Sequence, residues 1–300
     1  MIKGFDISSY QSHVDFASLK SAGYDFVIIK ASQGINIFDS MYQTHYKNAK
    51  AVGLIIGAYH FQDADYDGYK QYNFFKSCIN GTNPDFYALD IEDLNKSWTA
   101  TQINNVAKAF MLSVDKPTLL YTRPEFILEH SPQMVSWIVN YPNWVAYYGP
   151  LEQHKECLLN EVPSQAPFPY WSPLGWPFKT TKWWQWSGDC YTVKECDGAM
   201  DLNTYDGTLD DLKAWCGPTT VLPNPPPIPP VTVSGLAATA LQNMNIRSGP
   251  SISNPIVGSL NKGVAQTVLD INGNDVWVKI SNGWICYKQG TTSYLTLARN

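Results

Sequence analysis

Residues 86–93 read Phe86-Tyr87-Ala88-Leu89-Asp90-Ile91-Glu92-Asp93, and this stretch carries the pattern on which the fold depends. A short apolar run followed by acidic residues is typical of a buried strand that ends at a polar edge. Positions 90 and 92 differ by two, so both side chains lie on the same side of the strand, and Ile91 points the other way. The stretch therefore predicts a strand that delivers two carboxyl groups to one place.

Similar short apolar runs recur through the first two thirds of the chain. They predict eight strands, at residues 2–8, 26–32, 54–61, 86–93, 117–122, 144–149, 182–187 and 198–203. Helical patterns separate most of the early ones, at 15–22, 41–52, 69–79 and 101–113. Alternating strands and helices indicate parallel strands with right-handed crossovers. We expect an α/β fold, an irregular (β/α) barrel with fewer helices in its second half.

A proline tract divides the chain. Between Pro218 and Pro230, seven of thirteen residues are proline, which favours an extended spacer of roughly 40 Å. This predicts one domain over residues 1–217, a linker over 218–233 and a second domain over 234–300. The last segment has short strand-like runs and Asn-Gly turns, which are typical of a small all-β, SH3-like barrel.

Composition and charge exclude several classes of protein. The formal net charge is -5, whereas a nucleic-acid binder is usually basic, so no nucleic-acid partner is expected. From residue 234 onward there are five basic and two acidic residues, a net of +3, which leaves -8 for the rest. We find no apolar run long enough for a membrane span, and we expect no signal peptide at the N-terminus.

The six cysteines form no CxxC pair and no zinc-site spacing, so no metal site is expected. We expect mostly free, buried thiols, because a chain without a signal peptide is made in a reducing compartment. The spacing of Cys190 and Cys196 leaves a hairpin disulfide open.

Four acidic residues fall at the ends of predicted strands, where the active sites of parallel barrels lie. Asp6 lies near the end of the first strand, Asp90 and Glu92 lie near the end of the fourth, and Asp201 lies toward the end of the last. The first and last strands of a closed barrel are neighbours, so Asp6 and Asp201 can meet. One such acid is commonly a solvated loop residue, but four at one rim favour an active site. Crowded like charges keep one carboxyl protonated beside an ionised one, as glycosidic cleavage requires.

Three motifs, in order, resemble glycoside hydrolase family 25, the muramidases that cut bacterial cell-wall glycan. They are the run Gly4–Gln11 (GFDISSYQ), the run Ala88–Glu92 (ALDIE), and Trp184-Gln185-Trp186 followed by Asp201–Gly207 (DLNTYDG). The resemblance covers about residues 2–215. It implies that Glu92 is the general acid, that Asp90 stabilises positive charge or steers the substrate's N-acetyl group, and that Asp6 and Asp201 tune Glu92. It implies no cofactor and leaves open whether the intermediate is a covalent ester or forms by attack of the N-acetyl oxygen.

A sugar-binding groove is expected to present aromatic and amide side chains near the same strand ends. The candidates for substrate binding are Tyr59, Phe61, Tyr121, Tyr147, Gln185, Trp186 and, in the long aromatic segment 150–181, Trp171. His60 lies between two of these candidates, and strand alternation points it to the other face, which favours a structural role.

Residues 244–250 (MNIRSGP), 277–280, 283–285 and 294–295 resemble the strands of a bacterial SH3 domain, which implies targeting to a cell wall. A net charge of +3 suits an anionic wall surface. The two resemblances, to glycoside hydrolase family 25 and to a bacterial SH3 domain, together imply an endolysin-type lysozyme that cuts the β-1,4 bond after N-acetylmuramic acid in peptidoglycan. Its partners would be the wall, held peripherally, and a phage holin that releases it from the host bacterial cytoplasm.

Two other functions compete with this interpretation. A chitinase-like glycosidase needs the pattern D-x-x-D-x-D-x-E, in which Asp85, Asp90 and Glu92 fit but Ala88 occupies the second position. A non-catalytic wall-binding protein on a barrel that has lost its activity is opposed by the intact set of four acids.

Overall fold

The computed structural model describes residues 1–300 except 93–97, 149–154, 164–180, 218–235, 250–251, 253, 268–269, 273–276, 287, 290–291 and 300. The chain forms two compact units, Met1–Leu222 and Pro223–Asn300. The predicted linker 218–233 lies outside the described residues, so the finer domain boundaries stay a prediction.

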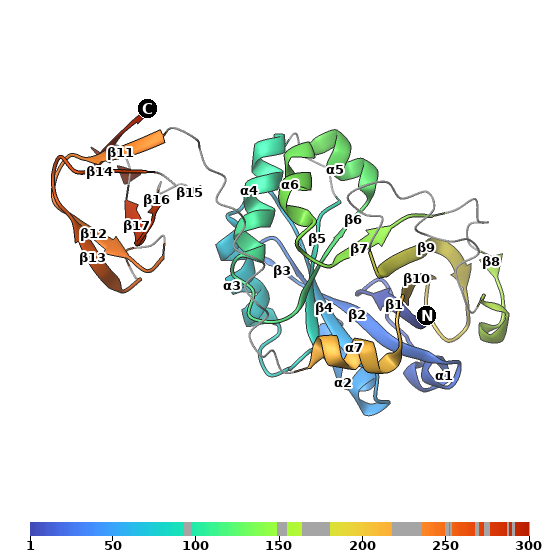
Figure 1. Ribbon diagram of the computed structural model, residues 1–300. Coiled ribbons are helices and arrows are strands. Elements are labelled where there is room, and N and C mark those ends of the chain that lie inside the picture. The colour runs from blue at the N-terminus through green and yellow to red at the C-terminus, as the bar shows by residue number, and fades with distance from the viewer. Residues whose placement is uncertain are drawn as a thin grey trace. The chain divides into compact units, whose positions relative to one another are not determined.

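Eight strands close into a barrel in the first unit (Figure 1). They are β1 (Ile2–Ile7), β2 (Tyr24–Gln33), β4 (Ile55–Phe61), β5 (Phe86–Asp90), β6 (Thr118–Thr122), β7 (Asn143–Ala146), β9 (Trp183–Thr192) and β10 (Ala199–Tyr205). Their order is β1-β10-β9-β7-β6-β5-β4-β2, and the pairing of β1 with β2 completes the ring. Short strands β3 (Ile37–Phe38) and β8 (Lys155–Glu156) pair with β2 and β9.

Helices follow most of the early strands, as the sequence predicts. The predicted ones are α1 (Phe16–Ser21), α2 (Tyr42–Ala51), α3 (Gly68–Cys78) and α4 (Ala100–Met111). Three more, α5 (Pro124–His130), α6 (Val135–Ile138) and α7 (Leu209–Cys216), are short, as are the 3₁₀ turns η1 (Pro132–Met134) and η2 (Leu159–Glu161). Side chains that precede the helices fix where they begin. Asp67 accepts hydrogen bonds from the amides of Tyr69 and Lys70, the second and third residues of α3, and Thr99 forms a capping box with Gln102 at α4.

The direction of the last strand differs from the expectation of a wholly parallel cylinder. β10 runs antiparallel to both β1 and β9, whereas the pairings β1–β2, β2–β4, β4–β5, β5–β6, β6–β7 and β7–β9 are parallel. A tight connection from β9 to β10 is enough for an antiparallel pair, whereas a parallel one needs a crossover. Asp201 therefore lies near the start of β10, and antiparallel pairing still places it opposite Asp6.

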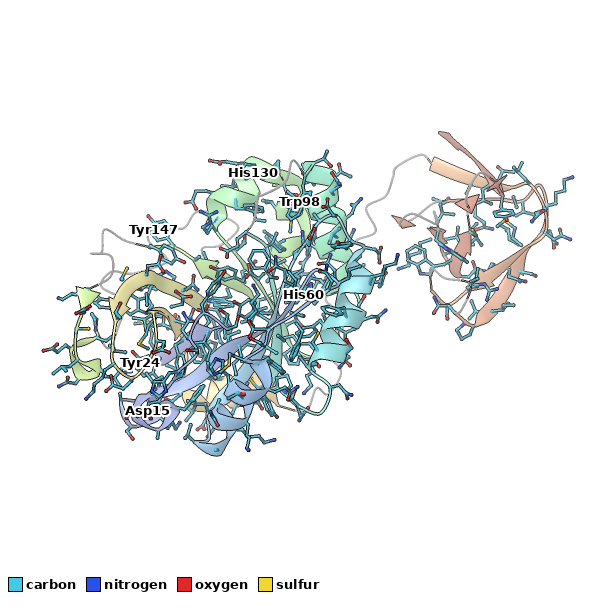
Figure 2. All side chains as sticks on the ribbon, turned by 180° about the vertical axis from the view of Figure 1, so that it is seen from behind. Asp15, Tyr24, His60, Trp98, His130 and Tyr147 are labelled. Carbon is cyan, nitrogen blue, oxygen red and sulfur yellow. The ribbon has the colours of Figure 1, made fainter. Side chains whose placement is uncertain are left out.

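The barrel interior and the layer between barrel and helices are both filled with aromatic side chains. Inside, Trp183 packs against Phe26, Phe86 and Tyr205 with ring centroids 4.9–5.3 Å apart. Outside, His60 stacks on Phe110 of α4 and is fully buried. Figure 2 labels His60 among the side chains of the first unit. The imidazole of His60 also meets the Ser32 hydroxyl at 2.9 Å, so its place in the helix layer agrees with the structural role predicted for it.

The second unit is all-β in its described residues. Its strands are β11 (Leu236–Ala240), β12 (Met244–Arg247), β13 (Ile256–Leu260), β14 (Ala265–Thr267), β15 (Asp270–Asn272), β16 (Trp277–Ile280), β17 (Gly283–Cys286), β18 (Lys288–Gln289), β19 (Thr292–Ser293) and β20 (Leu295–Arg299). A separate core includes Ile246, Val278 and Ile285. The predicted fold class, an irregular barrel followed by a small all-β barrel, is confirmed.

None of the six cysteines, all of them in the described residues, takes part in a disulfide, so Cys190 and Cys196 do not form the bridge that their spacing left open. No helix in the described part of the chain is long and apolar enough to cross a membrane.

Candidate active site

A polar pocket of about 400 Å³ lies at the end of the barrel where the parallel strands finish. Its lining residues are Asp6, Tyr59, Asp90, Glu92, Tyr121, Trp144, Tyr148, Gln185, Gly188, Asp189 and Asp201. The structure thus brings all four predicted acids, from β1, from the end of β5 and from β10, to one cavity.

The backbone after β5 holds Glu92 beside the neighbouring strand. β5 ends at Asp90, but the Ile91 amide still donates to the Tyr121 carbonyl, at 3.0 Å. The Thr122 hydroxyl donates to the Ile91 carbonyl at 2.7 Å. These bonds extend the strand geometry by two residues, so Glu92 faces the same pocket as Asp90.

Two amide side chains hold Asp6 in place. Its Oδ2 accepts hydrogen bonds from Gln185 Nε2 at 2.8 Å and from Asn203 Nδ2 at 2.7 Å. The orientation of Asn203 is fixed because Trp144 Nε1, which can only donate, bonds to Asn203 Oδ1 at 2.7 Å. An oxygen that accepts two N–H donors suits the ionised form of Asp6.

The buried carboxyl of Asp6 pairs with the partly buried carboxyl of Asp201, which lies opposite it across the β1–β10 ladder. Burial raises the pKa of Asp6 to about 7, although the hydrogen bonds from Asn203 and Gln185 act in the opposite direction. Burial, followed by repulsion from Asp6, raises the pKa of Asp201 well above its usual range. At neutral pH the pair therefore holds a proton on Asp201, while Asp6 is the side chain that ionises.

Two tyrosine hydroxyls converge on the same Gln185. Tyr121 Oη donates to Gln185 Oε1 at 2.7 Å and lies 3.3 Å from Glu92 Oε2. Tyr148 Oη also donates to Gln185 Oε1. Burial is the largest cause of the raised pKa of both tyrosines, with nearby acids adding to it, so both keep their protons.

The predicted substrate-binding residues separate into two groups. Tyr59, Tyr121 and Gln185 line the pocket. Strand alternation places Trp186 on the opposite face of β9 from Gln185, where it lies near Lys3 and Tyr24, away from the acidic pocket. Phe61 and Tyr147 are not among the described lining residues, and the ring of Phe61 carries the Lys30 ammonium 4.7 Å from its centroid. Trp171 lies outside the described residues.

The sequence interpretation missed Trp144, Tyr148, Gly188 and Asp189, which line the pocket, and Asn203, which binds Asp6. Trp144 and Tyr148 belong to the inward face of β7 and its continuation, and alternation from Trp144 would have selected Tyr148 in place of Tyr147. Asn203 is two residues beyond Asp201, so the same rule places it on the inner face.

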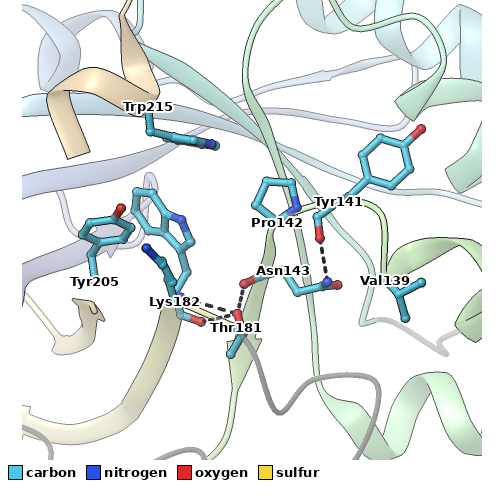
Figure 3. A pocket seen from close by; sticks show the side chains of 9 residues that line it. Val139, Tyr141, Pro142, Asn143, Thr181, Lys182, Tyr205 and Trp215 are labelled. Carbon is cyan, nitrogen blue, oxygen red and sulfur yellow. Dashed lines mark hydrogen bonds between the residues drawn. The ribbon is translucent and has the colours of Figure 1, made fainter. Parts of the chain in front are cut away.

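A second cavity, of about 320 Å³, lies at the opposite end of the barrel (Figure 3). It is lined by the starts of β7 and β9, the end of β10, and Trp215 of α7. None of its described lining residues is acidic, and it includes Lys182. The described lining of this second cavity therefore offers no carboxyl group for acid catalysis. In neither place do the described residues form a group of three or more His, Cys, Asp or Glu side chains that could hold a metal ion.

Residues 5–194 match the sequence profile of Glycosyl hydrolases family 25. The chain belongs to this family. It is 31% identical over 234 residues to the N,O-diacetylmuramidase of Chalaropsis sp, which covers 71% of this chain and 97% of that protein. As a family 25 glycoside hydrolase, it carries the four acids on the barrel rim described above.

Solved structures share this fold. The muramidase from Acremonium alcalophilum aligns with a TM-score of 0.55 and 28% identity, over 72% of this chain and 99% of that one. The CTP1L endolysin aligns with a TM-score of 0.51 and 29% identity, over 71% of this chain and 69% of that one. Residues 242–294 match the bacterial SH3 domain, so the second unit of this family 25 protein contains such a domain.

Proposed function

We propose that the chain is an endolysin-type lysozyme that hydrolyses the β-1,4 bond between N-acetylmuramic acid and N-acetylglucosamine in bacterial peptidoglycan. The observation that carries this proposal is the convergence of Asp6, Asp90, Glu92 and Asp201 on one open pocket. Family membership and the likeness to proteins named muramidase and endolysin support it.

Glu92 serves as the general acid. Its carboxyl proton passes to the glycosidic oxygen as the bond from that oxygen to the sugar's C1 breaks, and the leaving sugar departs as an alcohol. A water then adds its oxygen to C1 and gives its proton to the Glu92 carboxylate. This second transfer restores the acid for the next cycle.

The remaining acids supply negative charge where positive charge develops at C1. Asp90 is nearest to Glu92 in the chain and lines the same pocket. The Asp6–Asp201 pair holds one proton and adds a further negative charge when Asp6 ionises. Carboxylates that the fold holds in place against the protein interior stabilise an oxocarbenium-like transition state more strongly than they would in bulk water.

The second unit serves to hold the enzyme on the wall. Its net charge of +3 from residue 234 onward attracts it to an anionic surface, and tethering raises the local concentration of glycan at the barrel. We propose that the protein acts in lysis of a bacterium from within, after a phage holin has opened a path from the cytoplasm to the wall.

The proposal is tested by replacing the acid. Glu92→Gln keeps the shape of the side chain but has no acidic proton, so release of soluble fragments from purified peptidoglycan falls at least about 10²-fold. Wall binding stays. The matched control is Glu129→Gln, the same change at an exposed site on α5, which keeps full activity. Turnover of Glu92→Gln within a few fold of the unsubstituted protein would reject the assignment.

A further inference from the structure

Tyr121 has one hydroxyl proton and two acceptors within reach. Gln185 Oε1 lies at 2.7 Å and Glu92 Oε2 at 3.3 Å from its oxygen. A tyrosine hydroxyl donates one hydrogen bond at a time. The shorter distance assigns the proton to Gln185 in this structure, and the Glu92 oxygen lies close enough for a rotation of the O–H bond alone to reach it.

Gln185 does not depend on Tyr121 alone. Its Oε1 also accepts from Tyr148, and its Nε2 remains on Asp6 at 2.8 Å. A carbonyl oxygen that loses one of two donors still has its hydrogen bond, so the cost of releasing Tyr121 is small. Tyr148 therefore frees the Tyr121 proton without leaving a buried acceptor unpaired.

Gly188 leaves room for this second donor. A Cβ atom at position 188 would lie 3.2 Å from Tyr148 Oη and 3.3 Å from its Cζ, which is tighter than ordinary contact. The bare glycine on β9 lets the tyrosine ring approach Gln185 on the same strand. The arrangement of Gly188, Tyr148 and Gln185 is thus built to keep Tyr148 on the Gln185 carbonyl.

We propose that Tyr121 is a further catalytic residue, whose hydroxyl donates to Gln185 while Glu92 is protonated and turns to the Glu92 carboxylate once that proton has been given away. This inference rests on the proposed function of Glu92. While Glu92 is protonated, its own O–H can donate to Tyr121 Oη, and the Tyr121 proton stays on Gln185. After transfer to the glycosidic oxygen, the Tyr121 O–H rotates to Glu92 Oε2, and no proton leaves the tyrosine.

A hydrogen-bond donor near Glu92 stabilises its carboxylate, because acidic side chains surround it. The ionisable side chains that share its pocket come from seven of the eight barrel strands or their continuations, all but β2, and include no basic residue among those described: Asp6 of β1, Tyr59 of β4, Asp90 of β5, Tyr121 of β6, Tyr148 after β7, Asp189 of β9 and Asp201 of β10. The acids oppose a new negative charge on Glu92. A hydroxyl that turns toward the carboxylate offsets part of this repulsion, because a hydrogen bond to the charged form favours that form.

The test is a direct titration of Glu92 in the full chain, which needs no turnover. Glutamate is labelled with ¹³C at Cδ, and the Glu92 signal is the one missing from Glu92→Gln. In Tyr121→Phe the midpoint of the Glu92 titration moves up by about one pH unit, a tenfold change in its ionisation constant. Tyr148→Phe moves it the same way by about half as much, because Tyr121 must then stay on Gln185.

The control is Tyr141→Phe, which removes a hydroxyl at the other end of the barrel and leaves the midpoint unchanged (Figure 3). Circular dichroism checks that each variant is folded. An unchanged midpoint in folded Tyr121→Phe would overturn the role of Tyr121. A shift in Tyr121→Phe with none in Tyr148→Phe would overturn the shared donation to Gln185. The proposed function fails separately, if the unsubstituted protein releases nothing from peptidoglycan.

Discussion

Asp6→Asn should stabilise the first unit at alkaline pH while it removes a charge from the site. Asp6 is 5% exposed, and its pKa is raised from 3.8 to about 7, chiefly by burial. The folded protein therefore keeps a proton that the unfolded chain loses at lower pH. Between these two values stability falls as pH rises, by about 1.4 kcal/mol per pH unit.

If Asp6 alone carries the proton, the free energy of unfolding falls by about 4 kcal/mol between pH 4 and pH 7. If the proton is partly shared with Asp201, the fall is about 2–4 kcal/mol. An asparagine does not ionise, so it escapes this loss. Its Oδ1 can still accept from Gln185 and Asn203, and its Nδ2 faces Asp201. The variant should match the unsubstituted protein near pH 4 and exceed it by about 2–4 kcal/mol at pH 8.

Urea unfolding followed by the helical circular dichroism signal measures this, because every described helix lies in the first unit. Asp210→Asn, at an exposed position on α7, is the matched control and should leave the pH dependence unchanged. If the free energy of unfolding falls equally in Asp6→Asn and in the unsubstituted protein between pH 4 and 8, ionisation of the buried Asp6 carboxyl is not what lowers the stability. The rate of hydrolysis should fall in Asp6→Asn, because the variant lacks the negative charge of Asp6 at the site. The same buried charge lowers the stability of the unsubstituted protein, a common trade between activity and stability.

Two further changes test other parts of the account. Deletion of residues 234–300 should weaken lysis of whole cells, followed by turbidity, far more than cleavage of soluble glycan fragments. Only lysis of whole cells depends on attachment to the wall. Equal losses in the two assays would refute the targeting role. Gly57→Ala should lower the free energy of unfolding by about 1–3 kcal/mol, because a Cβ there would lie 2.5 Å from the Phe86 ring. An unchanged melting temperature in calorimetry would show that Phe86 moves aside at no cost in stability.

The strand pattern could be predicted because each barrel strand is a short apolar run, and alternation along it separates inner from outer residues. The same rule correctly placed His60 in the helix layer and Asp90 with Glu92 on the inner side. The alternation pattern is the same whichever way a strand runs, however, so it does not predict strand direction. Nothing in the run that contains Asp201 distinguishes a parallel from an antiparallel strand, so the polarity of β10 became evident only from its pairing with β1.

The sequence predicted four of the five acids among the described lining residues and missed Asp189, which lies beyond the predicted strand 182–187, together with several neutral residues. Charged groups at strand ends are conspicuous in a sequence, whereas Tyr148 and Asn203 belong to common residue types. Their importance comes from contacts across the barrel: Asn203 reaches Asp6 and Trp144, and Tyr148 reaches Gln185. Such contacts join residues far apart in the chain, so they depend on ring closure rather than on local pattern.

The most direct test of the central claim is the chemistry of the ends that the enzyme leaves. Purified peptidoglycan is digested with the full chain, reduced with borohydride and hydrolysed, and the reduced amino sugars are identified by mass spectrometry. Cleavage by the four-acid site after N-acetylmuramic acid predicts reduced muramic acid at the new ends, in amounts that grow with time and vanish with Glu92→Gln. Reduced glucosamine in its place, or no new reducing ends at all, would contradict the account.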